Sequence, residues 1–470
     1  MKENMLTKFL QALRDDEDLR VRNIDCGIKL TVVSMDTMSD DNKVSSYVMQ
    51  PLAYINDAAS INDVRVKIMT GAVAEKVTSM QQAMEVYSNG HTIVFDEQGN
   101  AISVDTRTSL ARSIAEPPTS MVLRGPREGF IEDVKVNLTL LRKRLKTQDF
   151  KYENLTVGKY TNTAVAVCYI DGIADKSVVD DIVQKISAIK TDGILDSTYL
   201  APYLDVEKTF LFRRVGVTEK PDIAVAKMLE GRVAIIVDGS PMVLTMPYLF
   251  MEDIQSPGDY YENSTMTALS RILRLISVIA SLLLPSLYVC LQEYNYQIIP
   301  LRFLITVMNA SEAIPFSPLS EMLLVLIIFD ILREANLRMP SAVGISLSLV
   351  GAIVLGDAAV KAGLLGAPAV MIGALSGIGL FTLPDNTLVM SLLRLVLTFI
   401  GGTMGLFGVT IAMMGIIFYL ASLQINKTPF LAPFAPLVPE DLKDGIAQKQ
   451  IASMNKRPRS VPNSNHTRRG

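Results

Sequence analysis

Charged residues become rare after Arg271, and this break constrains the fold more than any other feature of the chain. Of the 48 acidic and 45 basic side chains, about 69 lie in residues 1–271 and about 13 in residues 272–423. The surface of an aqueous domain carries charged side chains, whereas the core of a bilayer excludes them. The sequence therefore predicts a polar module joined to a membrane module.

The composition argues against several classes of function. The net charge of −3 gives no general attraction to nucleic acid, so no nucleic-acid partner is expected. The two histidines, His91 and His466, offer almost no material for a catalytic triad or a zinc site. Cys26, Cys168 and Cys290 lack metal-ligand spacing and are expected to be buried, reduced thiols. We therefore expect no enzyme activity, no cofactor and no metal site.

The N-terminal residues are polar and charged and contain no apolar stretch. A secretory signal needs such a stretch, so the first module is expected to stay in the cytosol.

A strand pattern occurs twice in the polar half. Residues 30–36 (LTVVSMD) form a short apolar run that ends in Asp, and residues 165–171 (VAVCYID) repeat it about 135 residues later. Residues 89–96 (NGHTIVFD) recur about 142 residues on as residues 230–238 (EGRVAIIVD). Two matches in the same order at nearly the same offset predict an internal duplication.

A helix and a hairpin accompany the second strand in each copy. Apolar side chains at helical spacing predict the two helices: Val77, Met80, Met84 and Tyr87 in the first copy, and Val179, Ile182, Ile186 and Ile189 in the second. Residues 97–100 and 238–240 are the expected hairpin turns. We therefore predict a cytosolic α+β region of two related lobes, residues 1–115 and 148–262.

Residues 116–147 are predicted to connect the two lobes. A Pro-rich break and a turn-rich segment precede apolar residues at 3-4-3-4 spacing, which predicts a short helix with a narrow apolar seam. This helix either packs on one lobe or joins two subunits. The candidate connector or oligomer contacts are Arg124, Pro126, Arg127, Phe130, Leu138, Leu141, Arg142 and Leu145.

Residues 263–423 are predicted to be an α-helical, multi-span transmembrane domain. The apolar stretches are 272–291, 319–332, 343–360, 364–383 and 388–423, and residues 298–314 look re-entrant or interfacial. The basic tail, residues 424–470, is expected in the cytosol together with the N-terminus. If both ends lie on one side of the membrane, the number of crossings must be even, and five single crossings would be odd. We expect four to six crossings.

Small residues and ionisable residues in this domain identify candidate sites of helix packing and of ion passage. Gly373 with Gly377, and Gly401 with Gly405, have the GxxxG spacing that allows close helix packing. Glu312, Glu321 and Asp330 lie at membrane depth, where a carboxylate is costly unless it faces protein or water. They are candidates for an ion path, and structural pairing is the alternative.

Several motifs resemble a known family. Residues 122–130 (VLRGPREGF), 140–144 (LLRKR), 229–241 (LEGRVAIIVDGSP), 256–261 (SPGDYY) and 332–340 (LREANLRMP) are similar to the signature of the A subunit of GerA-type nutrient germinant receptors of spore-forming bacteria. The resemblance runs from about residue 25 to residue 459.

The resemblance implies residence in the inner membrane of a dormant spore. It also implies assembly with a transporter-like B subunit and a lipoprotein C subunit. The small-residue helix faces, the few acidic residues beside the broken segment 298–314 and the lack of catalytic residues suggest a mechanism. We expect a homo-oligomer that acts as an ion channel or gate, with residues 260–274 coupling the lobes to the first span. A non-conducting scaffold subunit and the sporulation-stage paralogue of the same family remain alternatives. A secondary transporter usually has more spans, often as paired repeats, and is less favoured.

Overall fold

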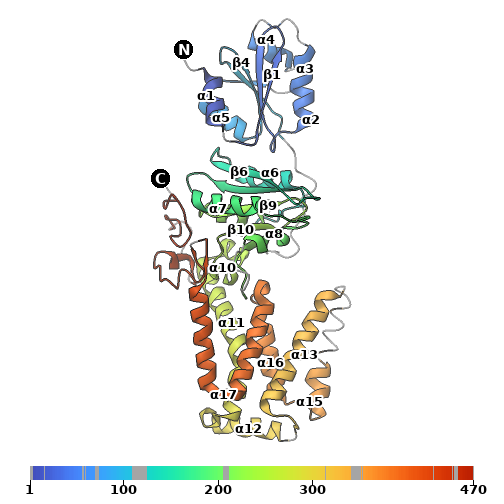
Figure 1. Ribbon diagram of the computed structural model, residues 1–470, viewed down its shortest axis with the longest axis vertical. Coiled ribbons are helices and arrows are strands. Elements are labelled where there is room, and N and C mark those ends of the chain that lie inside the picture. The colour runs from blue at the N-terminus through green and yellow to red at the C-terminus, as the bar shows by residue number, and fades with distance from the viewer. Residues whose placement is uncertain are drawn as a thin grey trace.

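The computed structural model places two α+β lobes one above the other over a bundle of long helices, with the C-terminal tail beside the second lobe (Figure 1). The structure describes residues 4–14, 16–54, 58, 60–68, 74–107, 124–204, 211–312, 314–339, 344, 351, 353–426, 428–446, 448 and 454–468.

The first lobe is a five-stranded antiparallel sheet with the strand order β1-β2-β4-β5-β3. Its elements are α1 (Met5–Ala12), β1 (Leu19–Asp25), β2 (Lys29–Met35), α2 (Asp41–Lys43), a π-helical turn (Val44–Met49), α3 (Gln50–Tyr54), α4 (Ile61–Ile68), β3 (Ala74–Val77), α5 (Met80–Ser88), β4 (Thr92–Asp96) and β5 (Ala101–Val104). The predicted turn at residues 97–100 joins β4 to β5.

The second lobe repeats this arrangement with the strand order β6-β7-β9-β10-β8. Its elements are α6 (Val134–Arg144), β6 (Phe150–Val157), β7 (Thr163–Ile170), α7 (Lys176–Ser187), α8 (Ser197–Leu204), β8 (Gly216–Thr218), α9 (Pro221–Met228), β9 (Val233–Val237) and β10 (Val243–Met246), followed by α10 (Met251–Ile254). Both sheets have the same order relative to the chain, which agrees with an internal duplication.

One detail of the predicted repeat is wrong. The helix that leads directly into β9 is α9, which corresponds to α5 of the first lobe. The apolar stripe at Val179, Ile182 and Ile186 instead forms α7, directly after β7. Val77 lies in β3 rather than in the helix. Helical spacing identifies an apolar face but does not say which of two helices in a repeat carries it.

The connector helix α6 packs on the sheet of the second lobe. Asp133 caps its N-terminus by accepting hydrogen bonds from the backbone of Lys135 and Val136. Leu138 and Leu141 are buried in a cluster that includes Cys168 of β7. Of the two alternatives left open by the sequence, the structure has the helix packed on a lobe.

The helical bundle begins with α11 (Ser264–Glu293). It continues with α12 (Leu301–Ser311), α13 (Pro318–Arg338), a π-helical turn (Val354–Ala358), α15 (Ala359–Lys361), α16 (Ala367–Leu380), a 3-10 helix (Pro384–Asn386) and α17 (Thr387–Ser422). Figure 1 shows α12 across the end of the bundle farthest from the lobes. Among the described residues, α11 and the segment Pro384–Ser422 are long and apolar enough to cross a bilayer. Most of the predicted stretch 343–360 lies outside the described residues.

The long helix α17 is a hairpin of two antiparallel arms that turn at Gly405. Gly405 has φ +64° and ψ −159°, which breaks the helix. A Cβ on Gly401 would lie 3.3 Å from Cγ2 of Val409, whereas residues eight apart in a straight helix are separated by about 12 Å. Each arm has the length of roughly one membrane crossing. The last predicted apolar stretch is therefore two helices instead of one.

The turn gives a first testable prediction. Gly405→Ala is expected to destabilise the chain by about 1–3 kcal/mol, because this backbone conformation is restricted to glycine. A Cβ at Gly405 would also lie 3.2 Å from the ring of Tyr294, whose hydroxyl binds the carbonyl of Thr403. The measurement is the thermal unfolding midpoint in detergent. Gly415→Ala is the matched control, since among the described residues nothing lies within 4 Å of a Cβ at that position. Equal midpoints for both variants would contradict the hairpin.

Candidate functional site

A short 3-10 helix (Pro257–Tyr261) joins the second lobe to α11. Ser256 and Asp259 form a capping box, in which the Asp259 carboxylate accepts the Ser256 backbone N–H at 3.1 Å. Asn263 then caps α11 by accepting the N–H of Thr265. The sequence SPGDYY therefore folds into a defined turn immediately before the first long helix.

Arg271 is the centre of this junction. Its side chain is completely buried, and its Nε donates to Asp259 at 3.0 Å. Its Nη1 donates to the Asp444 carboxylate at 3.0 Å and to the carbonyl of Gly445. Arg274 binds the other oxygen of Asp259 at 2.6 Å. One arginine of α11 therefore holds both the linker from the lobe and the C-terminal tail.

Asp259 is ionised in this setting. Burial alone would favour its protonated form, but hydrogen bonds from Arg274, the Ser256 backbone and Arg271 outweigh it and hold the pKa of Asp259 below its usual range. The junction is thus a buried ion cluster rather than a neutral contact.

The tail is also fixed to the second lobe. It contains β11 (Gln424–Ile425), β12 (Thr428–Pro429) and a 3-10 helix (Asp441–Asp444). Arg457 donates to the carbonyl of Leu229 at 2.7 Å, and Arg468 binds Glu230 at 2.9 Å. Asp441 accepts the hydroxyl of Ser460 at 2.5 Å. The tail therefore bridges α11 and the α9–β9 turn.

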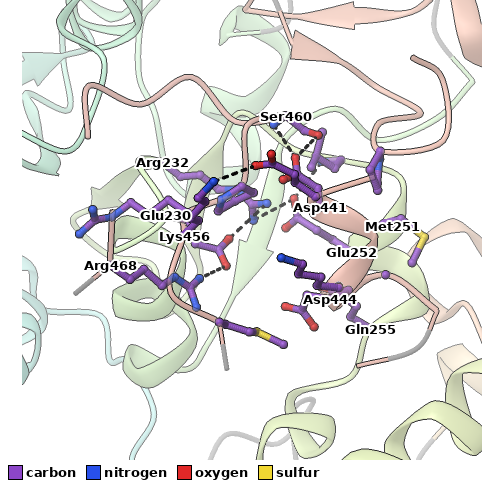
Figure 2. Close-up of a pocket in the computed structure, with 18 of the residues that line it drawn as sticks. Glu230, Arg232, Met251, Glu252, Gln255, Asp441, Asp444, Lys456, Ser460 and Arg468 are labelled. Atoms are coloured by element: carbon purple, nitrogen blue, oxygen red, sulfur yellow. Dashed lines mark hydrogen bonds and ion pairs between the residues drawn. The ribbon is translucent and has the colours of Figure 1, made fainter. Parts of the chain in front are cut away.

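A pocket of about 270 Å³ lies between the tail and the second lobe (Figure 2). Arg232 on its wall binds Glu252 at 3.0 Å, and Lys227 binds the same carboxylate at 2.6 Å. Burial opposes ionisation of Glu252, but these two cations lower its pKa. A second cavity of about 730 Å³ continues towards Arg274 and the loop between α16 and α17. Its polar walls carry charges of both signs.

Asp253 forms a second link between lobe and bundle. Its carboxylate accepts a hydrogen bond from the hydroxyl of Tyr248. It also accepts one, at 2.6 Å, from the side-chain amide of Asn386, the residue just before α17. Burial, together with the nearby carboxylates of Asp385 and Glu252, raises the pKa of Asp253 from 3.8 to about 7. This contact therefore changes its protonation near neutral pH.

This pKa predicts a pH dependence. Because the folded-state pKa lies above the unfolded value, the stabilisation by protonated Asp253 is fully present below about 3.9 and is lost as pH rises through about 7. The thermal unfolding midpoint of the full chain is expected to fall as the pH rises from about 3.9 to about 7. The Asp253→Asn variant is expected to show a smaller fall. An unchanged pH profile in the variant would contradict this role.

The two lobes are joined by a buried network around Arg142. Arg142 donates to Asp16 at 3.1 Å and to Asp18 at 3.3 Å, and all three side chains are almost fully buried. Asp18 also accepts hydroxyls from Thr37 at 2.7 Å and Tyr152 at 3.0 Å. Arg142, a predicted connector contact, therefore binds the other lobe of the same chain.

The other connector residues also contact their own chain. Phe130, Leu138, Leu141 and Leu145 are buried in the second lobe. The segment before Phe130 lies against the junction: Arg124 pairs with Glu262 at 3.6 Å, and the Pro126 carbonyl accepts from Lys220 at 2.9 Å.

A Cβ on Gly125 would lie 2.8 Å from the Tyr261 ring. Two motifs far apart in the sequence, around residues 125 and 260, therefore meet. Arg124 and Arg127 are exposed, and Pro126 is half-buried.

The candidate ion-path residues lie in different surroundings. Glu321 is buried and accepts the backbone N–H of Gly366 at the start of α16. The Asp330 carboxylate accepts a hydrogen bond from Arg394 at 3.0 Å and forms an ion pair with Arg333 at 3.3 Å. Glu312 is exposed at the end of α12. Glu321 and Asp330 stand roughly 13 Å apart along α13, so they do not form one cluster.

The candidate packing glycines also differ from one another. A Cβ on Gly373 would lie 2.5 Å from Val325 of α13, and one on Gly401 would lie 2.8 Å from the Ser286 carbonyl of α11. Gly377 has nothing within 4 Å among the described residues, and Gly405 forms the hairpin turn. Two of the four glycines thus mark close helix contacts. Within the described ranges, no group of three His, Cys, Asp or Glu side chains is placed to hold a metal ion.

The main feature missed in the sequence is the contact between Arg271 and the tail. The sequence did contain a local signal for an ion pair here. Two arginines, Arg271 and Arg274, stand at the start of an apolar helix and follow an Asp in a turn. Asp444 is 173 residues away, and nothing in its own sequence marks it as their partner.

Comparison with known proteins gives consistent matches. The family described as Bacillus/Clostridium GerA spore germination protein matches residues 7–460. Spore germination protein KA of Bacillus subtilis strain 168 is 33% identical and covers 96% of this chain and 85% of that protein. The uncharacterized membrane protein YfkQ of the same strain is 36% identical over 83% of this chain and 76% of that protein.

Spore germination protein GerQA of Bacillus cereus is 31% identical, over 96% of this chain and 91% of that protein. A crystal structure of the N-terminal domain of the A subunit of the Bacillus megaterium spore germinant receptor GerK3 is 24% identical with a TM-score of 0.41. It covers 52% of this chain and 94% of that chain.

Proposed function

The chain belongs to the GerA family of spore germination proteins, and we propose that it is the A-type membrane subunit of a spore nutrient germinant receptor. In this proposal a change in the cytosolic lobes passes through the junction at Arg271 into the helical bundle. The observation that carries it is that one fully buried arginine of α11 binds both the lobe linker and the tail.

The proposed topology has six crossings. The segments are α11, α13, the apolar stretch 343–360, α16 and the two arms of α17. In this topology the hairpin at Gly405 supplies the sixth crossing, which makes the number of crossings even. The N-terminus and the basic tail then lie on one side, which we assign to the cytosol. The membrane in this proposal is the inner membrane of the spore.

The proposed assembly is a homo-oligomer with a transporter-like B subunit and a lipoprotein C subunit. Its bundle forms or gates an ion path. Among the candidate connector contacts, Arg124 and Arg127 are the exposed ones, and they lie beside the junction where another subunit could reach them. The buried connector residues, in this proposal, stabilise the second lobe of their own chain and make no contact with another subunit.

Ion flux in liposomes tests the conducting role. Glu312→Gln and Glu321→Gln are expected to reduce flux through the assembled protein, because each removes a charge at membrane depth. Gln retains the carbonyl oxygen that accepts the Gly366 N–H, so the fold is preserved. Glu334→Gln, which removes the carboxylate of an exposed pair with Arg338, is the control. Unchanged flux in the first two variants would contradict the ion path.

A non-conducting scaffold is the second candidate. It is favoured by the bonding of Asp330 and Glu321 inside the bundle, where both have partners from neighbouring helices. Electrophysiology on the isolated oligomer separates the two: unitary currents support a channel, and a silent oligomer supports a scaffold. Expression during sporulation without receptor partners would instead favour the sporulation-stage paralogue.

A further inference from the structure

The sheet of the second lobe has one face towards the first lobe and one towards the bundle. On β7, Ala166 and Cys168 pack with α6 and α9. Val165 and Val167 pack in a cluster that contains α7 and α8 and continues to Val278 of α11. Helix α8 therefore lies in the layer between the sheet and the bundle, as Figure 1 also shows.

Helix α8 has a buried face and an exposed face, and both are apolar. Leu200 and Leu204 are buried against the lobe. On a second face of the helix Tyr199 is 55% exposed and Tyr203 44%, and Leu195, two residues before the helix, is 66% exposed. Thr198 and Pro202 fill the positions between them, so this exposed face carries no charge. A surface helix normally presents charged or polar side chains to water.

After α8 the chain reaches the outer surface of the bundle at Leu211. Leu211, which is 44% exposed, shares a groove with Ala412 and Ile416 of the second arm of α17. Its backbone N–H lies 3.5 Å from the hydroxyl of Tyr419. On the same arm, Phe418 is 67% exposed. Apolar side chains are thus exposed both on α8 and where Leu211 meets the second arm of α17.

We propose that α8 docks on the bilayer surface, with Leu195, Tyr199 and Tyr203 in the headgroup region next to the end of α17. This inference rests on the proposed membrane position of the bundle. Tyrosine favours this depth because its ring is apolar and its hydroxyl remains hydrated. The contact fixes the height of the second lobe above the membrane, so that motion in the lobes reaches α11 instead of tilting the whole lobe.

The chain contains no Trp, so single Trp substitutions report on one position each. Tyr199→Trp and Tyr203→Trp probe α8 in the full chain, reconstituted in phosphatidylcholine–phosphatidylglycerol vesicles. Phe399→Trp, on the first arm of α17, is the membrane control, and Tyr54→Trp, 86% exposed in the first lobe, is the aqueous control. Lipids with a nitroxide at the headgroup or deep in the acyl chain serve as quenchers.

The α8 probes are expected to lose fluorescence to the headgroup nitroxide more than to the deep one. The Tyr54→Trp variant is expected to lose it to neither and to remain quenched by aqueous acrylamide. Quenching of the α8 probes by acrylamide alone would overturn the proposal. Shielding from both acrylamide and lipid would also overturn it, in favour of a second copy of the chain on this face. Failure of the deep quencher at Phe399→Trp would instead contradict the membrane position of the bundle.

Discussion

Arg271→Met is expected to destabilise the full chain by about 3–5 kcal/mol. The side chain is completely buried between Asp259 and Asp444, and its removal leaves Asp444 without this cation and Asp259 with one cation instead of two. Arg274 would still hold Asp259, but the tail would lose its contact with α11. The measurement is the thermal unfolding midpoint in detergent, together with protease sensitivity of the tail.

Arg338→Met is the matched control for this prediction. Arg338 pairs with Glu334 at 2.7 Å on the bundle, but its side chain is 78% exposed. Exposed pairs contribute about 0–1 kcal/mol, so the midpoint is expected to change little. A wild-type midpoint and an uncleaved tail in Arg271→Met would show that the junction does not hold the parts together.

Arg142→Met is expected to have a similar effect between the two lobes, about 3–5 kcal/mol. It leaves Asp16 and Asp18 buried at the lobe contact without their cation, and it removes the guanidinium that lies 4.8 Å from the Phe150 ring. Hydrogen exchange is the measurement. The N–H of Thr37, which binds Asp18, is expected to exchange faster.

Low pH is expected to reduce this loss. Burial raises the pKa of Asp18 even beside Arg142, so its protonated form is favoured in the folded state and relieves the uncompensated charge as pH falls. Lys143→Met is the control, because Lys143 is exposed on the same helix and pairs with Glu128 at 3.1 Å. Equal exchange at Thr37 in both variants would contradict a structural role for the buried network.

The parts predicted correctly from the sequence are those with local signals. Short apolar runs ending in Asp, at residues 30–36 and 165–171, indicated β2 and β7, and the repeated order of such runs indicated two related lobes. The hairpin in α17 was missed because both arms are apolar and only Gly405 interrupts them. The partners of Arg271 and Arg142 were missed because they are more than a hundred residues away, and side-chain contacts of that kind leave no periodicity.

The family motifs gain a physical explanation from the structure. Glu128 binds Lys143 and Arg144, which ties the turn around residue 125 to the end of α6. Gly125 lies against Tyr261, whose hydroxyl binds Asp222. The motifs around residues 125, 142 and 260 thus meet beside the second lobe and end at the junction, on the proposed route from lobe to bundle.

If the lobes act on α11 through the junction, lengthening the chain at that point must uncouple them. A flexible Gly-Ser segment between Glu262 and Asn263 would separate the 3-10 helix from the cap of α11 while leaving both modules intact. The same segment after Gly99, in the turn between β4 and β5, is the control. With equal amounts of receptor in the spore membrane, the insertion after Glu262 is expected to abolish nutrient-triggered germination and the insertion after Gly99 to preserve it. Normal germination with the insertion after Glu262 would contradict the account.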